Sequence, residues 1–164
     1  MRYPLILTPL LASCAVITYD VTHDPIAARI SGQCFALQRD AYVVNTGSIG
    51  TKDQLMIPEG VCRSADGALV PNRRCSLTVK ALIPRGSTLT VLKVKNRAVG
   101  ESGRCWAVTA RLTPPSPFAG EIVVPSCGFD DLPQNWLDAL IPEWTKKPLE
   151  FKPNYLLPCG SPAP

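Results

Sequence analysis

The sequence is poor in the residue types that build common catalytic and metal sites. It has one histidine, His23, among 164 residues, so a Ser-His-Asp or Cys-His catalytic arrangement would depend on that side chain alone. None of the seven cysteines has another cysteine two to four residues away, the spacing typical of zinc ligands. A Walker phosphate loop, a dinucleotide-binding fingerprint and a zinc-protease motif are also lacking. These absences predict a protein that is not an enzyme and that holds no metal or cofactor.

Charge is sparse as well. Charged residues make up 18% of the chain, the formal net charge is +4, and Arg73-Arg74 and Lys146-Lys147 are the basic pairs. Proteins that bind nucleic acid usually carry a denser basic stripe. The sequence therefore predicts no nucleic-acid partner.

Cysteine, in contrast, is plentiful and spread along the chain. If Cys14 near the N-terminus has a separate role, six cysteines remain, an even number that can form three disulfides in an oxidising compartment. A loop between Cys62 and Cys75 holds two turn signals, Asp66-Gly67 and Pro71-Asn72, which makes this the preferred pair. The six disulfide candidates are Cys34, Cys62, Cys75, Cys105, Cys127 and Cys159.

The N-terminus has the features of an export signal. A short positive start, Met1-Arg2, precedes an apolar stretch over residues 5–11 that is too short to span a bilayer. The stretch ends in Leu11-Ala12-Ser13-Cys14, which resembles the lipobox of bacterial lipoproteins. The resemblance implies cleavage before Cys14 and lipid on its thiol, and several acyl chains together give stable membrane anchoring.

Two further features of this region bear on the lipoprotein interpretation. An N-terminal strand or helix with an incidental cysteine is the alternative, but Pro4 and Pro9 would interrupt either element. In enterobacterial lipoproteins an Asp after the lipidated cysteine favours retention in the inner membrane, and this chain has Ala15 there. The resemblance thus implies a location in the bacterial cell envelope, at the outer membrane facing the periplasm, with the inner membrane as the alternative.

The remaining chain predicts one β-domain. Residues 1–13 are expected to be the signal peptide, residues 14–30 a lipidated tether, residues 31–128 the β-domain, and residues 129–164 a short helix and Pro-rich extension that packs on it. Alternation of apolar and polar residues over 77–83 and 106–112 is typical of half-buried strands. Further strands are expected within 34–45, 89–94 and 121–124, and those at 77–83, 89–94 and 106–112 are expected to form a meander. The fold class is therefore mainly β, a small barrel or sandwich of about five to seven strands.

One part of this domain resembles a known family. Pro84, Gly86, Leu89 and Val91 form a Pro-x-Gly-x-x-Leu-x-Val turn before a strand, and Trp106 opens the next strand. This pattern, about thirty residues long, resembles bacterial Src-homology-three-like barrels. A closing Gly-Trp-Val after residue 120 is missing, so no ligand-binding residues are carried over from the family.

The C-terminal part predicts a short helix and an extended tail. Asp131 is expected to cap a helix that carries Trp136, Leu137 and Leu140 on one face and ends before Pro142. The Pro-rich tail follows, and its aromatic residues either pack on the domain or form a surface for a partner. These aromatic residues are Trp144, Phe151 and Tyr155.

These observations together favour a non-enzymatic lipoprotein that binds another protein of the cell envelope. An inhibitor, an immunity protein, or an accessory factor of secretion or of the envelope fits this description. A hydrolase acting on peptidoglycan or lipid is one alternative, and a structural outer-membrane lipoprotein is the other. Fold class alone does not decide between them.

Overall fold

The computed structural model describes residues 17–45, 52–58, 78–98, 104–126, 135–139 and 146–161. Within these ranges the chain forms nine strands and one short 3-10 helix, so the predicted mainly-β fold is confirmed, with more strands than the five to seven expected. The elements are β1 (Ile17–Asp20), η1 (Pro25–Ala27), β2 (Cys34–Leu37), β3 (Ala41–Asn45), β4 (Gln54–Met56), β5 (Thr78–Ile83), β6 (Thr88–Ala98), β7 (Arg104–Leu112), β8 (Glu121–Val124) and β9 (Leu156–Pro158).

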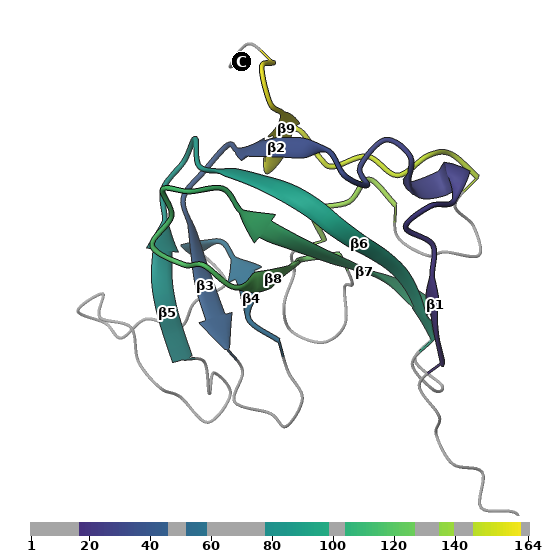
Figure 1. Cartoon of the computed structure of the whole chain (residues 1–164), viewed down its shortest axis with the longest axis horizontal. Coiled ribbons are helices and arrows are strands. Elements are labelled where there is room, and N and C mark those ends of the chain that lie inside the picture. The colour runs from purple at the N-terminus through teal and green to yellow at the C-terminus, as the bar shows by residue number, and fades with distance from the viewer. Residues whose placement is uncertain are drawn as a thin grey trace, which may run out of the picture.

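All nine strands belong to one curved sheet (Figure 1). The order is β5-β3-β4-β8-β7-β6-β2-β9, and β1 pairs with the far part of β6. The sheet is not closed into a barrel, because β5 and β9 stand at opposite ends of this path. Neighbouring strands are antiparallel except β4 and β8, which pair in parallel.

The expected meander is shifted by one strand. β6, β7 and β8 are consecutive antiparallel neighbours, whereas β5 pairs with β3 and not with β6. The turn before β6 explains this, since Gly86 adopts φ 85° and donates its N–H to the Leu37 carbonyl at 2.8 Å. The N–H of Arg85 donates to Asp40 Oδ1, also at 2.8 Å. These bonds hold the turn against the corner between β2 and β3, so β5 runs beside β3.

The core lies on the inner face of the sheet. The alternation predicted for β7 is confirmed, since Trp106, Val108, Ala110 and Leu112 are all at most 3% exposed. The register between β6 and β7 shifts between Val91 and Lys93. Beyond this bulge, buried Val94 alternates with cationic side chains on the outer face.

Much of the predicted tether belongs to the folded domain. β1 pairs with β6 from Ile17 opposite Ala98 to Asp20 opposite Lys95. Ala27 and Ile30 are buried in the core. Residues 14–30 were expected to be a tether because of their mixed polarity, but from Ile17 onward the backbone hydrogen bonds and apolar side chains of this segment are used by the domain.

The predicted C-terminal helix is wrong for the described residues 135–139. Asn135 Oδ1 accepts the Leu137 N–H at 3.0 Å and Asn135 Nδ2 donates to the Ala139 carbonyl at 2.9 Å, a local arrangement that competes with helix formation. The Trp136 N–H donates to the Pro125 carbonyl, and other backbone groups bond to the tail, with Leu137 in an antiparallel bridge to Phe151 and the Asp138 N–H bonded to the Glu150 carbonyl. The tail then supplies the last strand, because β9 pairs with β2.

Candidate functional site

A groove beside the C-terminal disulfide has a volume of about 800 Å³. It lies between the β2–β9 pair, the segment after η1, and residues 150–153 of the tail. In Figure 1, β2 and β9 are at the end of the molecule opposite the start of β1. The lining residues are Ala28, Arg29, Ile30, Gln33, Cys34, Phe35, Asp138, Glu150, Phe151, Pro153, Leu156, Leu157, Pro158 and Cys159.

The floor of the groove is apolar and firmly packed. Phe35 and Phe151 meet edge to face, with ring centroids 4.8 Å apart and an interplanar angle of 80°. Ile30 and Leu156 are each 1% exposed beside them. Aromatic pairs in this geometry add about 0.5–1.5 kcal/mol beyond the burial of their area. The floor is therefore preformed.

One wall of the groove is a disulfide between Cys34 and Cys159, whose Cα atoms are 5.4 Å apart. The Cys159 N–H also donates to the Cys34 carbonyl at 3.0 Å. Cys105 is disulfide-bonded too, and its partner lies outside the described residues. Cys14, Cys127 and the preferred pair Cys62–Cys75 lie outside the described residues as well.

Charged side chains form the rim. Arg29 forms an ion pair with Glu150, and the two side chains are 63% and 51% exposed. An ion pair this exposed contributes at most about 1 kcal/mol to folding, so both groups remain available to a ligand. Asp138 is held nearby through its N–H, which donates to the Glu150 carbonyl at 2.8 Å. A neighbouring cavity of about 310 Å³ shares these three residues and adds Lys147 and Pro148.

The aromatic residues predicted as a partner surface have different positions. Phe151 is only 7% exposed and belongs to the floor, so it does not form an exposed contact surface. Tyr155 stacks on buried Trp136, with ring centroids 5.1 Å apart and planes 2° apart. Trp144 lies outside the described residues. Sequence reasoning missed the rim residues Arg29, Asp138 and Glu150, because no motif links charges so far apart in the chain.

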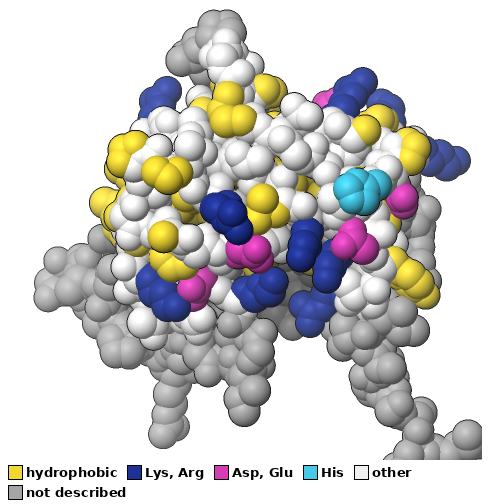
Figure 2. Space-filling view, in the orientation of Figure 1, with side chains coloured by type: hydrophobic (Ala, Val, Ile, Leu, Met, Phe, Trp, Pro, Cys, Tyr) yellow, Lys and Arg dark blue, Asp and Glu magenta, His cyan; other side chains and the backbone are white. Residues whose placement is uncertain are grey.

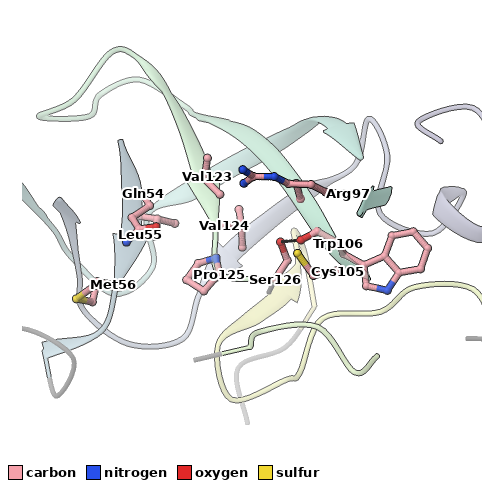
Figure 3. A pocket seen from close by; sticks show the side chains of 11 residues that line it. Gln54, Leu55, Met56, Arg97, Cys105, Trp106, Val123, Val124, Pro125 and Ser126 are labelled. Carbon is pink, nitrogen blue, oxygen red and sulfur yellow. Dashed lines mark hydrogen bonds between the residues drawn. The ribbon is translucent and has the colours of Figure 1, made fainter. Parts of the chain in front are cut away.

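A second cavity of about 160 Å³ lies across β4, β8, β7 and β6. Figure 3 shows Gln54, Val123 and Arg97 brought to it from three of these strands. Its polar residue Ser126 is already engaged, since its hydroxyl donates to the Trp106 carbonyl at 2.9 Å and accepts the Val108 N–H at 3.1 Å. The cavity is smaller than the roughly 300–1,000 Å³ usual for ligand pockets.

Two carboxyl groups have a lowered pKa. Hydrogen bonds from the side chains of Lys80 and Asn45 lower the pKa of Asp53. Hydrogen bonds from the hydroxyl and N–H of Thr22, together with the charge of Lys95, lower the pKa of Asp20. A general acid needs a raised pKa, so neither group fits that role at neutral pH.

Two searches of the described residues concern metals and membranes. In these ranges no three His, Cys, Asp or Glu side chains come together in a way that could hold a metal ion. Nor does any helix found there have the length and apolar character needed to cross a membrane.

Comparisons with protein-family models, with curated proteins and with solved structures find no match to this chain. Inference about its function therefore depends on its own sequence and geometry.

Proposed function

We propose that the chain is a non-enzymatic bacterial lipoprotein, anchored to a membrane through lipid on Cys14, that binds another protein of the cell envelope in the groove beside the C-terminal disulfide. The observation that carries this proposal is the position of the groove. Its walls β2 and β9 lie at the end of the molecule opposite the start of β1 (Figure 1), and β1 begins three residues after Cys14. An anchored domain with this arrangement presents the groove away from its membrane.

The disulfides support a location outside the cytoplasm. Cys34 and Cys159 are bonded, and so is Cys105. Disulfides of this kind persist in the periplasm and are rare in the cytosol. They agree with the export signal, and we place the protein at the outer membrane, facing the periplasm.

The character of the groove favours a protein partner. An apolar floor of Phe35 and Phe151 is surrounded by Arg29, Asp138 and Glu150, and interfaces between proteins commonly have an apolar centre and a polar, solvated rim. Charges of both signs on the rim allow a partner of complementary pattern to be selected. We therefore expect partner side chains to enter the groove.

The partner is expected to bind through side chains and not by adding a strand to β9. The outer edge of β9 has few free backbone groups, because the Leu156 N–H donates to the Lys152 carbonyl at 3.2 Å. Pro158 has no N–H, and its carbonyl accepts the Ser161 N–H at 3.1 Å. An edge of this kind resists pairing with another chain.

Crosslinking in intact cells, followed by purification of the protein, tests the binding proposal. Arg29→Glu places a carboxylate beside Glu150 at the groove, while Arg85→Glu makes the same change of charge at an exposed turn elsewhere. Wild type and Arg85→Glu should recover the same crosslinked protein, and Arg29→Glu should recover at least tenfold less of it. Equal recovery with all three proteins would reject the groove as the binding site.

The anchor is tested separately. Cys14→Ala should leave an uncleaved precursor that does not incorporate labelled fatty acid, because the thiol is the acceptor of the lipid. Normal maturation of this variant would reject the lipoprotein proposal.

A further inference from the structure

A row of cations lies on the outer face of β6. Lys93, Lys95 and Arg97 alternate there with the inner-face residues Val94 and Asn96, and Lys93 and Arg97 are exposed. None of the three cations forms an ion pair within the described part of the chain, although the charge of Lys95 helps to lower the pKa of Asp20. The row therefore leaves positive charge directed at solvent.

The surface beside this row is also positive on balance. On β8, Glu121 is shared by two cations, with Lys52 Nζ 3.9 Å and Arg111 Nη2 3.7 Å from its carboxylate oxygens. Figure 2 shows Lys and Arg side chains gathered across the middle of this face, with fewer Asp and Glu side chains between them. The groups on and beside the row are therefore five cations and two carboxylates, and the net charge of this part of the face is positive. They are Lys52, Lys93, Lys95, Arg97 and Arg111, with Asp20 and Glu121.

The proposed anchor holds this face close to a membrane. Three Cα–Cα steps separate Cys14 from Ile17, which limits their distance to about 11 Å. Pairing of β1 with β6 places Thr18 opposite Arg97 and Asp20 opposite Lys95. Arg97 is thus beside the first residues that follow the anchor, and the row Arg97, Lys95, Lys93 runs away from it over roughly 13 Å at about 3.3 Å per residue.

We propose that the outer face of β6 lies against the anionic phospholipid of the membrane that holds the anchor, with Lys93, Lys95 and Arg97 next to the headgroup phosphates. This inference rests on the proposed lipidation of Cys14. The anchor brings one end of the row to the bilayer, and the attraction of each further cation to an anionic surface tilts the sheet onto it.

The orientation has a consequence for the groove. The basic row lies on the outer face of the sheet, whereas the groove-floor residue Phe35 is paired with buried Leu89 and so lies on the inner face. Contact between the outer face of β6 and the membrane therefore leaves the groove open to a partner. The membrane and the partner would use separate surfaces.

Lysine acetylation on liposomes tests this orientation. The purified mature lipoprotein is reconstituted on vesicles of phosphatidylcholine alone or of phosphatidylcholine with phosphatidylglycerol, floated, and treated with an acetylating reagent. Lys93 and Lys95 should react at least threefold more slowly on the anionic vesicles, and 0.5 M salt should remove most of the difference because it screens the charges. Exposed Lys146 and Lys147 should react equally on both.

A matched pair of variants identifies the cause of any protection. Lys93→Gln/Arg97→Gln removes two cations of the row, and Arg85→Gln/Lys147→Gln removes two exposed cations elsewhere. Protection of Lys95 on anionic vesicles should fall at least twofold in the first variant and stay unchanged in the second. Equal fall in both variants would overturn the proposal.

The remaining outcomes separate this proposal from the proposed function. Flotation on both kinds of vesicle with equal acetylation of Lys95 would overturn the orientation and leave the anchor intact. Protection of Lys146 and Lys147 in place of Lys93 and Lys95 would also overturn it. Flotation with neither vesicle would contradict the lipid anchor, and the orientation would fall with it.

Discussion

Removing the disulfide between Cys34 and Cys159 should cost about 3–5 kcal/mol of unfolding free energy. The bonded residues are 125 positions apart, and the chain-entropy treatment of a loop of this length gives about 5 kcal/mol. Cys105 lies inside the loop and is itself disulfide-bonded, which shortens the free chain that the bond closes and lowers this value. The double variant Cys34→Ala/Cys159→Ala avoids leaving a free thiol.

Guanidinium denaturation under non-reducing conditions measures this loss. The fluorescence of the buried indoles Trp106 and Trp136 reports the global transition. Hydrogen exchange reports local loosening of β9, because the N–H of residue 159 and that of Gln38 bond across the β2–β9 pair. Ser161→Ala, an exposed change just beyond the bond, should alter stability by less than about 0.5 kcal/mol. A loss below about 1 kcal/mol in the double variant would refute the entropic reasoning.

Three further measurements test other parts of the structure. Since hydrogen bonds from Lys80 and Asn45 lower the pKa of Asp53, this group stabilises the fold above its unfolded pKa of about 3.9, and the contribution is lost as pH falls through the folded pKa. Asp53→Ala should lower the free energy of unfolding by about 1 kcal/mol at pH 7, a small value because Lys80 is 41% exposed. Below about pH 4 the melting temperatures of the variant and of wild type should converge, and a difference between them that widens on acidification would contradict this reasoning. Phe151→Ala removes the ring that packs on Phe35 and should cost about 3–5 kcal/mol by chemical denaturation, whereas a loss under about 1 kcal/mol would mean that the groove floor is not part of the core. Thiol counting on the denatured, unreduced mature protein should detect no free thiol among the six domain cysteines, and two or more would overturn the scheme of three bridges.

The central strands were predictable because their pattern is local. Trp106, Val108, Ala110 and Leu112 face the core from one side of β7, and alternation over the seven residues 106–112 indicates this from the sequence alone. The short strands were not predictable in the same way. β1 and β9 have four and three residues, and their pairing with β6 and β2 is a long-range property that no local pattern encodes.

The helix prediction is wrong at residues 135–139, and part of the reason can be found in the sequence. Trp136 and Leu137 have helical spacing from Leu140, but Asn135 can bond its side chain to the local backbone, and it does so with Leu137 and Ala139. The groove could not be predicted from the sequence. Its rim residues Arg29 and Glu150 are separated by 121 positions, and only the folded tail brings them together.

Strand β2 has both of its neighbours only after the last strand of the chain has been made. The ribosome adds roughly 5–20 residues per second, so the 125 positions between Cys34 and Cys159 correspond to about 6–25 s of synthesis. During that time one edge of β2 is unpaired and Phe35 lacks the ring of Phe151. Contacts this distant in sequence also slow folding itself. The nascent chain therefore exposes β2 longer than most of its strands, and a holding chaperone that recognises apolar, extended segments would find its binding site there.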